Sequence, residues 1–179
     1  FPHALGFSSV ENNDLLLIGS LEPIEMDFGN IKNRMAQTEV ATDLERIGIS
    51  YLYTLLTTQI FDESGIRQWA GIGPVNSDDF PLVEYSAPRG FFNADRVDLP
   101  TEYRLAGADN FLSTYITQHE PTADELVEAA NYQMVSGMTY MVFSALGDAL
   151  EREPEHPEGL ELMVRLLTER KKFAEAMEI

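Results

Sequence analysis

The densest group of chemically capable side chains near a loop consists of Asn76, Asp78, Asp79 and Glu84. Several carboxylates close together are what a cation or a polycationic ligand such as a polyamine requires, so one interpretation is a binding site for such a ligand. The other interpretation is structural, because Asn and Asp also cap helices and hold turns. Either role requires flanking elements that hold the loop in place.

Other catalytic and metal-binding patterns are weak. The histidines His3, His119 and His156 are far apart and form no His-x-x-x-His pair, so the sequence gives little support for a zinc site. The chain has no Cys, which excludes disulfides, thiolate metal sites and a cysteine nucleophile. Gly71-Ile72-Gly73 lacks the third glycine of a phosphate-binding loop and runs into Pro74, which favours a plain loop. We therefore assign no catalytic, metal or cofactor-binding residue in this chain.

Charge and length limit the classes of function. With 30 acidic and 12 basic residues the formal net charge is -18, so most of the surface repels nucleic acid and anionic membranes. A hydrophobic content of 44% over 179 residues is typical of a globular protein with one domain or two small ones. No uninterrupted apolar run reaches the length of about 18 residues that a membrane helix needs, so we expect no direct membrane insertion by this segment.

Two short strands are predicted at the start of the chain, over Phe1 to Phe7 and Leu15 to Ile18, joined by a polar turn at Glu11 to Asp14. The unbroken apolar run of the second strand predicts that it is covered on both faces. Two strands alone are marginal in water, so the sheet must be completed by a strand at Val83 to Ser86, by a second chain or by a preceding part of the protein. An unpaired edge would favour homo-oligomers.

The spacing of apolar residues then changes to three or four. Asp27 is a good helix cap, and the pattern from Phe28 to Ile47 predicts an amphipathic helix that is broken near Gln37 and Thr38 and stops at Gly48. A second helix is predicted from Ser50 to Phe61, and a short helical turn before Gly71.

A change of character follows Phe92. The run Asn93 to Pro100 has no period and contains a helix breaker, which predicts a boundary or linker before a helix near Asp109 to Gln118. We therefore divide the chain into residues 1–92, a linker with a bridging helix at 93–120, and a helical region at 121–179.

The polar loop that contains Asn76, Asp78, Asp79 and Glu84 also resembles part of a known protein family. The order Asn-Ser-Asp-Asp-x-Pro-Leu-Val-Glu-Tyr-Ser-Ala-Pro-Arg at 76–89 resembles the C-terminal signature of bacterial spermidine synthase-like proteins, especially those in which this domain follows membrane helices. The family usually has Thr where this chain has Ser77, and often Arg where it has Phe80. Asn13 to Ser20 and Glu22 to Ile24 look like the family's last sheet strand and the turn after it, so the resemblance covers about residues 1–92.

This resemblance implies an α+β fold in which short strands form the edge of a class I methyltransferase-like sheet with covering helices. Spermidine synthases are aminopropyltransferases that use decarboxylated S-adenosylmethionine and a polyamine acceptor. Their nucleotide motifs match no position here, so none of their catalytic residues is transferred to this chain. For the intact protein the resemblance implies an S-adenosylmethionine-type nucleotide, contact with the upstream part of the same protein, and a place at the cytoplasmic face of the bacterial inner membrane, held there by upstream helices.

The last third of the chain carries a second pattern. When Pro154 is aligned with the proline that ends a tetratricopeptide repeat of about 34 residues, small and apolar residues fall at the expected places. A second unit continues in register, and a simple helical hairpin is the alternative. The aligned positions are Leu126, Ala130, Gly137, Leu146 and Ala149, then Leu160, Met163, Leu167, Phe173 and Ala176.

Two functional hypotheses follow. In the first, the chain is the C-terminal segment of a spermidine synthase-like transferase whose reaction centre lies elsewhere, and the helical tail docks a partner. In the alternative, it is a non-catalytic scaffold or protein-interaction module that binds a protein or peptide through the helical repeat.

Overall fold

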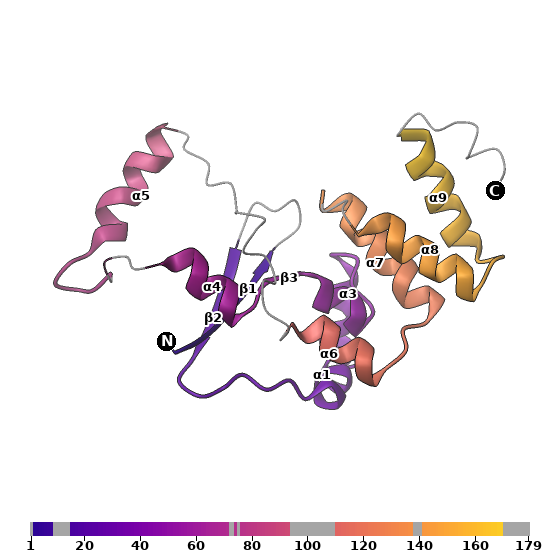
Figure 1. Cartoon of the computed structure of the whole chain (residues 1–179), viewed down its shortest axis with the longest axis horizontal. Helices are drawn as coiled ribbons and strands as arrows, with labels where there is room; N and C mark the ends of the chain where they lie inside the picture. The colour runs from indigo at the N-terminus through magenta and orange to yellow at the C-terminus, as the bar shows by residue number, and fades with distance from the viewer. Residues whose placement is uncertain are drawn as a thin grey trace.

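The computed structural model describes residues 2–8, 15–71, 74, 76–93, 110–137 and 141–169 (Figure 1). Within these ranges the protein is α+β and mostly helical, with a three-stranded antiparallel sheet and nine helices. Several predicted features lie outside them, namely the turn at 11–14, Gly73, most of the linker (94–109) and the repeat positions Phe173 and Ala176. No helix among the described residues is long and apolar enough to cross a bilayer.

The sheet has the order β2-β1-β3. β1 (His3–Ser8) pairs antiparallel with β2 (Leu15–Ser20), in a register that matches His3 with Ser20 and Ser8 with Leu15. Both predicted N-terminal strands are therefore confirmed. The third strand, β3 (Gln59–Phe61), pairs antiparallel with the other edge of β1 and has a register shift opposite Gly6 and Phe7.

The prediction of one helix from Ser50 to Phe61 is wrong at its C-terminal end, where β3 takes the place of the last helical turn. The helix found there, α3 (Leu52–Thr57), stops early, because Thr57 and Thr58 turn their hydroxyls back to carbonyls of the preceding turn. β-branched residues favour extended backbone, and the chain enters the strand directly after them. The sheet is thus completed on one side by a segment that the pattern assigned to a helix.

The prediction that the second strand is covered on both faces is wrong for β2. It lies at the edge of the sheet, and its side chains Leu16, Leu17 and Ile18 are 61%, 56% and 43% exposed. Side chains of successive strand residues point to opposite faces, so both faces of β2 present apolar surface.

The broken helix after Asp27 is confirmed. α1 (Phe28–Met35) begins where Asp27 Oδ1 accepts the N–H of Asn30 at 2.9 Å, and α2 (Thr38–Glu45) follows after a break at Ala36 and Gln37. Gly48 ends this segment with φ of 75°, a left-handed conformation that favours glycine.

The short helix predicted before Gly71 is α4 (Glu63–Ala70). Buried Asp62 caps it by accepting the N–H of Gly65 at 2.7 Å. Trp69 on this helix stacks on Phe61 of β3, with ring centroids 5.1 Å apart and an interplanar angle of 13°. α4 is therefore fixed to the sheet by an aromatic contact as well as by its cap.

The predicted strand at Val83 to Ser86 is wrong, because these residues lie in α5 (Leu82–Asn93). Pro81 directly precedes the helix, where a fixed φ and a missing N–H cost nothing, and Ser86 Oγ donates to the carbonyl of Leu82 at 2.7 Å. Pro88 lies inside the helix and cannot donate to the carbonyl four residues before it. In Figure 1, α5 stands away from the sheet.

The predicted helix near Asp109 to Gln118 is present. It is followed by a hairpin of two packed helices at 123–135 and 142–152. Asn110 Oδ1 caps the first helix by accepting the N–H of Ser113, and Leu112 and Tyr115 are buried, whereas Ile116 is 43% exposed. The hairpin buries Leu126, Ala130, Leu146 and Ala149, as both the repeat and the simple hairpin require. The bounds are α6 (Phe111–Gln118), α7 (Ala123–Val135), α8 (Val142–Arg152) and α9 (Pro157–Glu169).

One hydrophobic core joins the helices of the first half to the helical region. It includes Phe28, Leu56, Tyr115, Leu126 and Leu146 among its buried members. The same packing brings α3 against α7, where Glu128 Oε1 accepts the N–H groups of Ser50 and Tyr51 at 2.9 Å each. A carboxylate from α7 therefore caps the start of α3.

Candidate functional site

The predicted polar loop forms a small closed turn. Ser77 and Phe80 pair through two backbone hydrogen bonds of 2.9 and 3.2 Å, with Asp78 and Asp79 exposed between them, and Asn76 directly precedes the turn. Glu84 is exposed in the first turn of α5, where a carboxylate complements the helix dipole. Among the described residues, no three acidic or histidine side chains lie close enough to hold a metal ion. The structure thus places Asp78 and Asp79 in a turn and Glu84 at the start of a helix.

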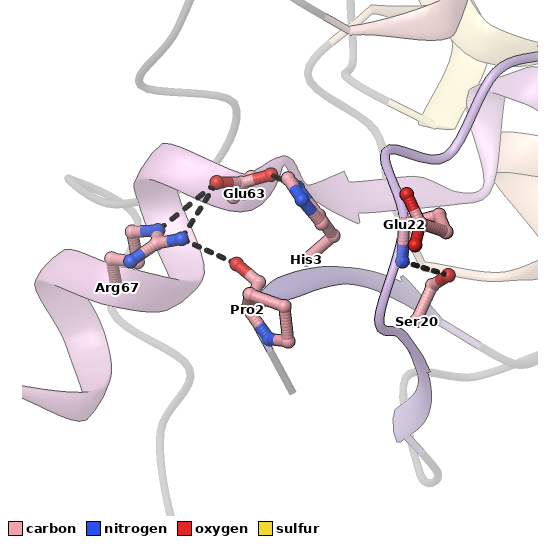
Figure 2. A network of polar contacts seen from close by, with 6 residues as sticks. All are labelled: Pro2, His3, Ser20, Glu22, Glu63 and Arg67. Carbon is pink, nitrogen blue, oxygen red and sulfur yellow. Dashed lines mark hydrogen bonds and ion pairs between the residues drawn. The ribbon is translucent and has the colours of Figure 1, made fainter.

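A polar network lies instead where β1 meets α4 (Figure 2). His3 Nδ1 lies 2.7 Å from Glu63 Oε2, and Arg67 donates from Nε and Nη2 to Glu63 Oε1 at 3.1 and 2.8 Å. Arg67 Nη2 also donates to the carbonyl of Pro2. Hydrogen bonds from His3 and then from Arg67 hold the pKa of the Glu63 carboxyl below its ordinary value.

This network has the partial form of an acid–base site. An ionised carboxylate only accepts, so His3 donates from Nδ1 to Glu63, and Nε2 of the neutral ring is left as an acceptor. His3, Ser64, Arg67 and Phe111 line a cavity of about 420 Å³ beside it. No hydroxyl nucleophile among the described residues is hydrogen-bonded to His3, so the arrangement orients an imidazole without completing a catalytic triad.

The other two histidines have different roles. His119 is stacked on Tyr115, with ring centroids 4.8 Å apart and an interplanar angle of 12°. His156 is buried, and its Nε2 lies 2.9 Å from Asp124 Oδ1. The three predicted candidates thus lie in three separate places, as their spacing in the sequence indicated.

An apolar groove of about 620 Å³ runs beside β2. Phe7 and Leu16 contribute from the sheet, Ile31 and Ile47 from the first helical segment and its end, and Leu55 from α3. Leu16 and Ile18 of β2 line this groove and are 61% and 43% exposed.

Comparison of the chain with protein-family models, with curated proteins and with solved structures gives no match. Sequence reasoning missed the pairing of His3 with Glu63, because 60 positions separate them and neither belongs to a recognisable motif. It also missed the apolar groove, whose walls come from five separate segments of the chain.

Proposed function

We propose that residues 1–92 form the closing hairpin and covering helices of a spermidine synthase-like transferase fold. In this proposal the S-adenosylmethionine-type nucleotide and the polyamine bind to the upstream part of the same protein, since none of the family's nucleotide motifs matches this chain. The helical region then provides a tetratricopeptide-like surface for a partner protein.

The observation that supports the proposal most is that β2 is an edge strand with exposed apolar side chains. An edge strand normally avoids association through charges, prolines or a short length. β2 has none of these protections, since its sequence is Leu-Leu-Leu-Ile-Gly-Ser and three of its apolar side chains are exposed. A strand of this composition suits the interior of a larger sheet, where both edges are paired and both faces are covered.

The antiparallel pairing of β1 with β2 supports the same role. The family resemblance places the last sheet strand at Asn13 to Ser20, and this segment contains β2. Among the described residues β2 pairs with β1 on one edge and with no strand on the other, so one more strand can add there without disturbing the hairpin. The apolar groove beside β2 would be covered by the same addition.

Hydrogen exchange tests this role. In the chain alone, every second residue of β2 directs its N–H toward the open edge, so we expect alternate fast and slow amides over residues 15–20. In the parent protein, which includes the preceding sequence, we expect all of these amides to exchange slowly. Equal exchange patterns in the two proteins would contradict the proposal.

A pair of substitutions makes the test specific. Leu17→Lys places a charge on the exposed strand, whereas Leu21→Lys places the same charge at a position that is 74% exposed and just beyond the strand. We expect both variants of the chain alone to unfold at the same urea concentration as the wild type. In the parent protein only Leu17→Lys should weaken S-adenosylmethionine binding, measured by calorimetry. Saturable nucleotide binding by this chain alone would show that the site is misplaced.

A further inference from the structure

A second groove, separate from the sheet, lies between the first two helices and the start of α7. Its volume is about 660 Å³. Met35 and Leu44 from α1 and α2, and Ile49 and Leu52 at the start of α3, give it an apolar floor. Its size is within the range of cavities that bind small ligands or the anchor side chains of peptides.

The rim of this groove is acidic. Glu45 and Glu120 line it, and both are exposed. Glu125 also lines it but is engaged, because its Oε2 accepts the N–H of Thr122 at 2.9 Å and its Oε1 accepts the hydroxyl of Tyr115 at 3.2 Å. Glu120 Oε1 also lies 3.8 Å from Arg152 Nη2, but its side chain is 85% exposed, so Glu45 and Glu120 are the carboxylates of the rim that a partner can reach.

The aromatic wall of the groove already attracts a cation. The Lys32 ammonium nitrogen lies 4.9 Å from the centroid of the Tyr115 ring, a cation–π distance. Among the described residues that line the groove, Lys32 is the one Lys or Arg, and His119 lies there as well. Tyr115 itself is 1% exposed and His119 is stacked on its ring, so a cation from a partner would meet the carboxylates of the rim rather than this ring.

Tyr51 connects this groove to a neighbouring one along α7 and α9. It lines both, and the second groove adds Asp124, Glu128, Glu158 and Glu161. Burial first, and then the charges of Asp124 and Glu128, raise the pKa of the Tyr51 hydroxyl. The apolar floor thus continues into a surface that carries these four carboxylates together with Arg165.

We infer that this groove docks a basic amphipathic peptide segment of a partner protein, with apolar side chains on the floor and Lys or Arg at the rim. The apolar floor requires an apolar anchor, and the rim selects against acidic partners by like-charge repulsion. The net charge of -18 also speeds the encounter with a basic segment. This inference does not depend on the role proposed for β2.

Fluorescence anisotropy with labelled peptides tests the inference. The probe has the sequence KKLLKKLLKK, and a second peptide, KKSSKKSSKK, keeps the charge without the apolar anchors. At about 0.15 M salt, where distant charges are screened, we expect saturable binding of the first peptide and at least tenfold weaker binding of the second. Absence of binding by the leucine peptide, or equal binding of both peptides, overturns the inference.

Matched variants separate the groove from the overall charge. Glu45→Gln with Glu120→Gln neutralises the rim, and Glu25→Gln with Glu151→Gln makes the same change in net charge at exposed positions that do not line the groove. Each exposed ion pair changes affinity by up to about fivefold, so the rim variant should bind several-fold more weakly than the control. Equal loss in both variants would show that only the net charge attracts the peptide.

Lys32 supplies a test in the opposite direction. Lys32→Gln removes the competing cation from the groove, whereas Arg34→Gln removes a positive charge from the same helix at an exposed position that does not line the groove. We expect the first variant to bind the leucine peptide more tightly than the second. The reverse order would contradict the placement of the peptide in this groove.

Discussion

The imidazole of His156 joins two helix starts, because its Nε2 lies 2.9 Å from Asp124 Oδ1 and its Nδ1 accepts the N–H of Gly159 at 3.1 Å. Since Nδ1 accepts, Nε2 carries the proton and donates to Asp124. The ring therefore caps α9 and ties it to the first turn of α7. His156 is 5% exposed, whereas the Asp124 side chain is 65% exposed, so the contact is shielded from water on the imidazole side alone.

His156→Ala should lower the free energy of unfolding by about 1 to 3 kcal/mol, because it removes a helix cap and leaves the N–H of Gly159 without its partner. Urea unfolding followed by circular dichroism measures the change. His156→Asn is the matched control, since Asn caps helices well but is too short to reach Asp124 in the same way. The free energy of unfolding of the Asn variant should lie between those of the wild type and the Ala variant. An Ala variant as stable as the wild type would contradict the capping role of His156.

The Glu63 network should make stability depend on acid. The pKa of Glu63 is lower in the folded chain than in the unfolded one, so the stabilisation is present above the ordinary Glu pKa and is lost as pH falls through the lowered value. Glu63→Gln removes this titration. We expect the wild type to have a higher Tm than Glu63→Gln at pH 7. Thermal unfolding at a series of pH values should show that this difference in Tm becomes smaller towards pH 3.

The control for that series is Glu22→Gln, which removes a carboxylate near the network. Glu22 bonds to Ser20 Oγ through its backbone N–H and not through its side chain, so the substitution keeps this hydrogen bond. This variant should follow the wild-type pH profile. If Glu63→Gln and Glu22→Gln gave the same profile, the contacts of His3 and Arg67 with Glu63 would contribute nothing to stability.

Gly6 of β1 lies opposite Phe61 of β3. A Cβ at this position would lie 2.9 Å from Phe61 Cδ2 and 3.1 Å from Phe61 Cβ, and Phe61 is fully buried. Gly6→Ala should therefore destabilise the fold by about 1 to 3 kcal/mol through overpacking. Trp69, the single Trp of the chain, stacks on Phe61 and reports the change by its fluorescence.

Gly147→Ala is the control for Gly6→Ala, because no atom lies within 4 Å of a Cβ at that position in α8. Ala is favoured over Gly inside helices, so this variant should be as stable as the wild type or more stable. Similar destabilisation of both variants would show that space at Gly6 is not the cause.

Local signals predicted much of the fold. Asp27 and Gly48 set the limits of the first helical segment because a side-chain cap and a positive φ are properties of single residues. The strands at His3 and Leu15 were also recoverable from composition. At Val83 and Tyr85 the same reasoning failed, since β-branched and aromatic residues suggested a strand where Pro81 starts a helix.

The candidate sites were much less accessible from sequence. The groove beneath Leu44 and Tyr51 and the contact of His3 with Glu63 are formed by segments that meet only after folding. The exposure of Leu17 is a property of the sheet order, which depends on the position of Gln59 to Phe61. Apolar composition predicted that the strand needs cover but could not show that this chain leaves it open.

The uncharged edge of β2 also affects how the purified chain behaves in solution. Mutual repulsion between strongly acidic molecules keeps these edges apart, and dissolved salt shortens the range of that repulsion to about 8 Å near 0.15 M. Concentrated samples should therefore stay monomeric in dilute buffer and form edge-to-edge aggregates when salt is added or the pH approaches the isoelectric point.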